Sequence, residues 1–159
     1  MVGHFSHAAQ QTDLYVGELV NHVNALLGKR QRNEMDVENM NLKQSIQQLT
    51  DEIEILQKEA ESARAEAEAA EEEASASKKT LDETLSAADQ VLDDGETEEA
   101  ADIVEKSEAD TRAHLQATAV AKKKQDEARD AQKKLADTHD KKRSLRSRLQ
   151  AVKQAVDNI

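Results

Sequence analysis

Apolar side chains recur at steps of three and four residues along much of the chain. Residues three and four apart share one face of a helix, and alternating these steps gives a coiled-coil seam. The first run therefore predicts a long helix with one narrow apolar seam. It consists of Ile46, Leu49, Ile53, Leu56, Ala60, Ala63, Ala67, Ala70 and Ala74, and it reaches Leu81, Ala88 and Val91 past polar Ser77 and Thr84.

A second run with the same spacing occupies the C-terminal part of the chain. It consists of Ala128, Ala131, Leu135, Leu145, Leu149, Val152, Val156 and Ile159, with Thr138 and Lys142 as polar positions. Between Leu115 and Ala128 the apolar phase drifts, which predicts a stutter in the heptad pattern.

The segment 93–97 carries the strongest internal turn signal, with Asp94, Gly95 and Thr97. Glycine accepts the left-handed backbone that a reversal needs, and threonine is a good helix N-cap. These signals predict a helical hairpin over 33–159 with its tip near 93–97. Residues should then lie opposite each other when their numbers add to roughly 190, which places Ala60 against Ala131.

The N-terminal segment 1–30 shows a wider apolar stripe with helical spacing. Gly28 follows it together with several cations, a combination that is typical of a helix C-terminus. We therefore expect an all-α fold: a short amphipathic N-terminal helix followed by a long antiparallel coiled-coil helical hairpin. The stripe is formed by Phe5, Val16, Leu19, Val20, Val23, Leu26 and Leu27.

Composition and charge fit this architecture. Charged residues make up 35% of the 159 residues and aromatic residues 1%, so the chain can bury a thin seam but no bulky core. Residues 1–110 carry 27 acidic and 9 basic side chains, a balance of −18, whereas residues 111–159 carry 13 basic and 6 acidic ones, a balance of +7. The basic stretch 122–153 suits either an anionic ligand or the acidic arm of the hairpin. We favour the acidic arm, because no aromatic side chains for base stacking accompany the cations.

No arrangement typical of an enzyme accompanies these patterns, and we expect no catalytic residue, metal, cofactor, small-molecule substrate or nucleic acid. His4 and His7 have the spacing of a helical metal pair, but nothing nearby completes a site. Asp93, Asp94 and Gly95 lack the ligand spacing of a calcium loop. Without cysteine, a secretory signal or a long apolar run, the sequence favours a cytoplasmic protein.

Three stretches of the chain carry distinctive motifs: Gly3-His4-Phe5-Ser6, the segment 20–29 with the sequence Val-Asn-His-Val-Asn-Ala-Leu-Leu-Gly-Lys, and the segment from Leu92 to Glu105-Lys106. Together they resemble the family of phage shock protein A and the vesicle-inducing protein in plastids, bacterial ESCRT-III-like proteins. The first stretch is similar to the family's opening Gly-x-Phe-Ser, and the second resembles its Val-Asn-x-x-Ile-Asn-Ala-Leu-Leu-x-Lys. The segment from Leu92 to Glu105-Lys106 resembles the charged hairpin tip. The resemblance implies a short form that lacks the family's C-terminal helices.

From this resemblance we expect a self-assembling, peripheral membrane-remodelling protein that forms large homo-oligomers on the inner face of the cell membrane. The apolar stripe would then contact an anionic membrane surface. The alternative is a coiled-coil scaffold or filament-forming interaction protein without membrane contact, whose stripe packs on the hairpin base or on another subunit. A thin alanine seam favours self-assembly in either case, because each alanine buries little area.

Overall fold

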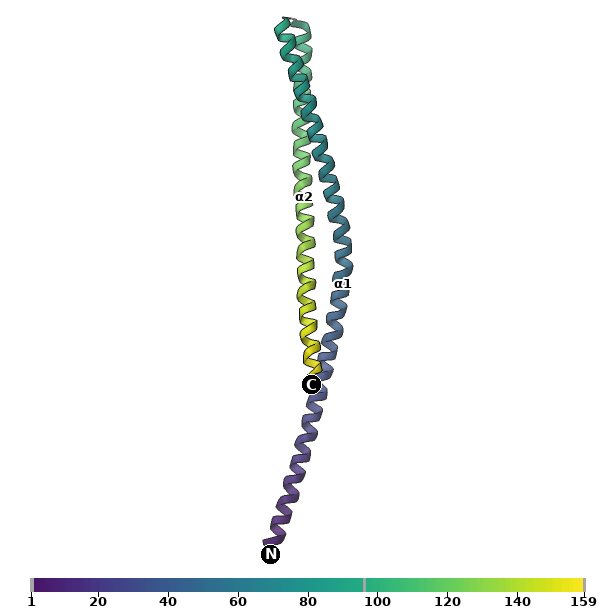
Figure 1. Ribbon diagram of the computed structural model, residues 1–159, viewed down its shortest axis with the longest axis vertical. Coiled ribbons are helices and arrows are strands. Elements are labelled where there is room, and N and C mark those ends of the chain that lie inside the picture. The colour runs from purple at the N-terminus through teal and green to yellow at the C-terminus, as the bar shows by residue number, and fades with distance from the viewer. Residues whose placement is uncertain (1, 96, 159) are drawn as a thin grey trace. The chain divides into compact units, whose positions relative to one another are not determined.

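The computed structural model describes the backbone of residues 2–95 and 97–158 and the side chains of residues 10–95 and 98–158. This part of the chain forms two α-helices, α1 (Val2–Asp94) and α2 (Thr97–Asp157), which run antiparallel (Figure 1). The described residues contain no strand. The predicted all-α helical hairpin is therefore confirmed.

The reversal between the helices lies at the predicted tip. Gly95 has a φ of 74°, and its N–H donates a hydrogen bond of 3.3 Å to the carbonyl oxygen of Leu92. Among the described residues, only this glycine adopts a left-handed backbone. Glu98 and Glu99 occupy the first turn of α2, where carboxylates interact favourably with the helix dipole. The side chain of Thr97, the predicted cap, lies outside the described residues.

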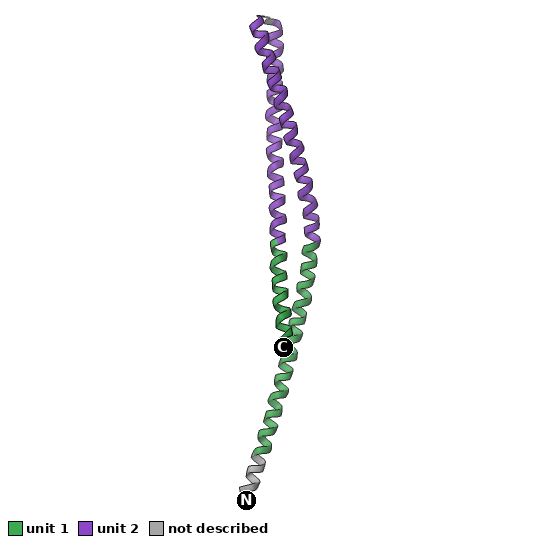
Figure 2. Cartoon of the chain, in the orientation of Figure 1, with its two compact units in different colours: residues 1–50, 140–159 green, residues 51–139 purple. Residues whose placement is uncertain are grey.

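The chain divides into two compact units, each built from one segment of α1 and one of α2 (Figure 2). Unit 2 comprises residues 51–139 and includes the tip. A cluster of buried apolar side chains joins Ile53, Leu56 and Ala60 of α1 to Leu135 of α2, with Ala131 packed against them. Ala60 and Ala131 thus meet as the predicted register requires.

The remainder of the unit 2 seam is thin. Ala67, Ala70 and Ala121 are buried, and so are the polar side chains of Thr84 and Thr138. An alanine buries little more than one methyl group, about 1 kcal/mol of hydrophobic stabilisation or less. This part of the seam therefore combines small buried areas with polar contacts instead of a bulky core.

The stutter predicted between Leu115 and Ala128 is wrong. The least exposed residues of α2 keep heptad steps through Asp110, His114, Ala117, Ala121, Lys124 and Ala128. Leu115 lies off this row with 64% of its surface exposed. Polar side chains at three of the seam positions carry the phase, so a search for apolar residues misses it.

Unit 1 comprises residues 1–50 and 140–159, described here from residue 2 to residue 158. Leu42 of α1 is buried, and the predicted seam residues Ile46, Leu49, Leu145, Leu149 and Val152 are partly buried. Arg148 donates two hydrogen bonds to one carboxylate oxygen of Glu38, at 2.8 and 3.1 Å, and this pair ties α2 to α1. Towards the N-terminus, α1 continues beyond the point where α2 ends (Figure 2).

The predicted separate N-terminal helix is also wrong, because α1 runs from Val2 to Asp94 without a break. A glycine ends a helix when it turns left-handed, and Gly28 has no positive φ. Glycine inside a helix costs only about 1 kcal/mol relative to alanine, which the flanking helix formers tolerate. An ion pair of 3.3 Å between Arg30 and Glu34, one turn apart, follows directly after Gly28.

Candidate interaction surfaces

The apolar stripe of the N-terminal segment lies on α1 in unit 1 and faces solvent. Every described side chain from residue 10 to residue 27 is exposed. Val23 is the least exposed stripe residue at 45% and Leu27 the most exposed at 57%, with Val16, Leu19, Val20 and Leu26 between them. Phe5 lies outside the residues whose side chains the structure describes. From Val16 to Leu27 the stripe is therefore a continuous apolar surface that no other described residue covers.

The stripe faces away from the side of α1 that is covered in unit 1. The covered row follows heptad steps through Met35, Asn39, Leu42, Ile46 and Leu49. Continued towards the N-terminus in the same steps, this row passes through Arg32, Gly28, Ala25 and Asn21, none of which belongs to the stripe. Because one face of a helix recurs at these steps, the stripe occupies a different face. Among the described residues, we see no contact that would support packing of the stripe on the hairpin base.

The stripe's own phase continues along α1. Steps of three and four from Leu27 reach Arg30, Glu34 and then Val37, which is 53% exposed. Met40 lies fourteen residues beyond Leu26, on the same face, and is 56% exposed. The exposed apolar face is thus interrupted by the ion pair of Arg30 and Glu34 and resumes at Val37 and Met40, on the side of α1 away from the covered row.

Two hydrogen-bonding contacts between seam residues join the helices of unit 2. The Thr84 hydroxyl donates to a carboxylate oxygen of Asp110 at 2.6 Å, and Ser77 Oγ lies 3.1 Å from Nδ1 of His114. Sequence reasoning placed Ser77 and Thr84 in the seam as interruptions but missed their partners. Opposite polar residues in two seams whose numbers add to about 190 are the signal that could have found them.

The basic stretch of α2 meets acidic residues of α1. Lys124 Nζ lies 2.9 Å from Glu66 and 3.4 Å from Glu127, and Gln125 donates a hydrogen bond to Glu71. The hydrogen bond to Glu66, reinforced by the charge of Glu127, raises the pKa of Lys124. Together with Arg148 and Glu38 in unit 1, these contacts agree with the expected pairing of the two arms.

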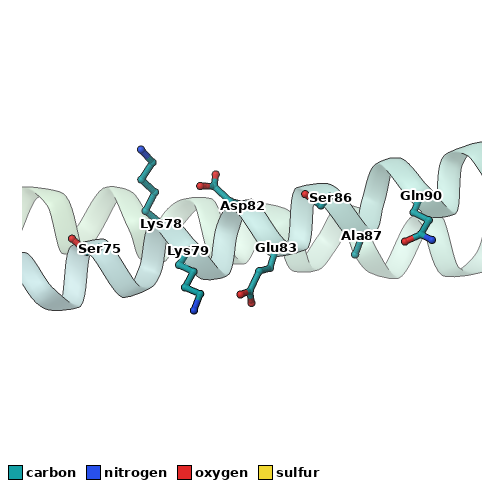
Figure 3. Close-up of a pocket in the computed structure, with 8 residues that line it drawn as sticks. All are labelled: Ser75, Lys78, Lys79, Asp82, Glu83, Ser86, Ala87 and Gln90. Atoms are coloured by element: carbon teal, nitrogen blue, oxygen red, sulfur yellow. The ribbon is translucent and has the colours of Figure 1, made fainter.

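The described residues offer no arrangement that suggests catalysis. An open groove beside α1 in unit 2 is lined by one helix only. Lys78 and Asp82 point to one side of this helix, and Lys79 and Glu83 point to the other (Figure 3). Within the described side chains, no group of three or more histidine, cysteine, aspartate or glutamate residues could hold a metal ion. His4 and His7 lie outside those side chains. None of the described helices is long and apolar enough to cross a membrane.

Comparisons with known proteins add no functional information, so the functional argument rests on the surfaces described above. Neither a family model, nor a curated protein, nor a solved structure matches this chain.

Proposed function

We propose that this protein is a self-assembling peripheral membrane protein of the phage-shock type, which acts mechanically as an ESCRT-III-like polymer at the inner face of the cell membrane. The observation that carries the proposal is the exposed apolar stripe of α1. The resemblance of segment 20–29 to the phage-shock family supports it, because the stripe runs through that segment.

The stripe has the size that shallow membrane insertion requires. Its six described side chains are about half exposed, and covering the outward half of each should contribute on the order of 1 kcal/mol. A helix that lies in the headgroup region buries such a face without crossing the bilayer. The insertion energy is modest for one chain, so many chains acting together would anchor a polymer firmly.

The charges at the end of the stripe support contact with an anionic surface. Lys29, Arg30 and Arg32 follow the stripe directly, and all three are exposed. Each cation near an anionic membrane surface contributes about 1 kcal/mol. Asp13 and Glu18, the charged residues between 10 and 28, act in the opposite direction. The scaffold alternative draws its support from these two carboxylates and from the lack of lysine and arginine between residues 10 and 28.

Flotation with vesicles tests the proposal. Intact protein should float with vesicles that contain anionic phospholipid, whereas Val20→Glu and Leu26→Glu should abolish flotation, because each would bring a carboxylate to an apolar boundary. Asn21→Glu is the matched control, because it adds the same charge on the opposite face of the same helical turn. Failure of the intact protein to float with anionic or neutral vesicles would leave the scaffold alternative.

A further inference from the structure

We propose that two copies of this chain dock through their apolar stripes in an antiparallel arrangement, and that each stripe is covered by its counterpart in solution. This proposal goes beyond membrane binding and does not rest on it. It concerns the same side chains and assigns them a second occupant, another copy of the chain.

The central row of the stripe has the spacing of a coiled-coil seam. Val16, Val20, Val23 and Leu27 follow in steps of four, three and four, and each is about half exposed. Leu19 and Leu26 lie on one flank of this row, two turns apart, and widen the apolar face. Such a row packs against an equivalent row through interlocking side chains.

Charges at the two ends of the row determine the orientation of the second copy. Asp13 lies three residues before Val16, and Arg30 lies three residues after Leu27, both in phase with the row. In an antiparallel pair, residues lie opposite each other when their numbers add to a constant. With a sum of 43, Val16 faces Leu27, Val20 faces Val23, and Asp13 faces Arg30.

This register closes on itself. The same contacts occur twice about a twofold axis, so one surface serves both copies and association through this surface stops at two. A parallel pair would instead place Asp13 against Asp13 and Arg30 against Arg30, which like-charge repulsion disfavours. Arg30 already lies 3.3 Å from Glu34, and its side chain is 78% exposed, so it remains within reach of a carboxylate from another copy.

Disulfide cross-linking of the full chain tests the orientation and the register. The protein has no cysteine, so Val16→Cys and Leu27→Cys can be introduced singly. Disulfides require Cα atoms within about 7 Å. A mixture of the two variants, without lipid, should form the 16–27 disulfide at least tenfold faster than either variant alone, because residue 16 lies on the order of 16 Å along the axis from its own counterpart.

Glu18→Cys mixed with Ala25→Cys is the matched control. These numbers also add to 43, so the two residues lie at the same level, but on the outer faces of the pair, and they should not cross-link. Rapid cross-linking of either Val16→Cys or Leu27→Cys alone would show a parallel pair and overturn the proposal. Absence of the mixed disulfide would overturn it as well.

Charge reversal provides an independent readout by sedimentation equilibrium. Asp13→Arg and Arg30→Asp should each weaken self-association on the order of tenfold, because two ion pairs are replaced by two like-charge contacts. The double variant should restore it. If the double variant is as weak as the single ones, Asp13 and Arg30 do not face each other. Because these measurements contain no vesicles, their outcome is independent of the flotation experiment.

Discussion

The stripe of unit 1 and the seam of unit 2 differ in the size of their apolar side chains, and the larger ones are the more exposed. The exposed stripe consists of valine and leucine, whereas much of the covered seam consists of alanine, threonine and other polar residues. A chain selected only for a stable hairpin would place its larger side chains inside. This difference supports our proposals, in which the stripe serves a partner outside the hairpin.

Truncating one leucine in each region is the most direct way to test this contrast. Leu56 is 5% exposed and belongs to the main apolar cluster, so Leu56→Ala should destabilise the protein by about 2–3 kcal/mol. Leu26 is 55% exposed, and Leu26→Ala should change the free energy of unfolding by no more than about 0.5 kcal/mol. Urea denaturation at low protein concentration measures both. Equal losses would show that the stripe packs within its own chain.

The polar part of the seam should contribute through hydrogen bonds instead of area. Thr84→Val keeps the shape of the side chain but leaves the partly buried Asp110 carboxylate without its hydroxyl donor, which should cost about 1–3 kcal/mol. Thr84→Ser keeps the hydroxyl and serves as the control. A valine variant as stable as the wild type would mean that water replaces the hydroxyl at no cost.

The two glycines that the sequence marked as helix ends should respond to alanine with opposite signs. Apart from its chain neighbours and the nearby backbone of its own helix, no described atom lies within 4 Å of a Cβ added at Gly28, and its φ is not positive. Gly28→Ala should therefore stabilise that turn by up to about 1 kcal/mol. Gly95 has a φ of 74°, and Gly95→Ala should destabilise the tip by about 1 kcal/mol. Hydrogen exchange resolves the two sites separately, with slower exchange expected around residue 28 and faster exchange around residue 95.

The Lys124 contact should have the smallest effect, because it lies at the exposed edge of the seam. Its pKa is raised in the folded state by the hydrogen bond to Glu66. Its contribution should therefore be fully present below about pH 10.5 and should disappear as the pH rises through the higher folded-state pKa. Unfolding midpoints of the wild type and Lys124→Gln should differ at pH 7 and converge in strong alkali. Lys122→Gln removes the same charge two residues away and controls for the loss of charge.

The hairpin could be predicted from sequence because three signals agree. Large apolar residues such as Ile53 and Leu56 define the seam, Gly95 marks the only place where the described backbone turns left-handed, and the acidic and basic arms match in register. Ala60 and Ala131 then meet as folding-back geometry requires.

The two wrong predictions, a separate N-terminal helix and a stutter in the heptad pattern, have physical causes. Gly28 carries the same local signal as a helix end, but its backbone keeps a helical φ and α1 continues through it. His114 and Lys124 keep the heptad phase where apolar side chains are missing, so the seam there could be found only from its cross-helix partners. The candidate stripe was visible in sequence, but its exposure and its direction relative to the covered row were not.

The unbroken course of α1 through Gly28 means that rotation is transmitted from the hairpin to the stripe. Each residue advances an α-helix by about 100° around its axis. The angle about the axis of α1 at which the stripe faces, measured from α2 in unit 1, is therefore set by the number of residues between Leu27 and Leu42. Two residues inserted there would turn the stripe through about 200°, while seven would return it almost to its starting direction. The direction of the stripe thus depends less on the length of the connecting helix than on the fraction of a helical turn left after its whole turns are counted.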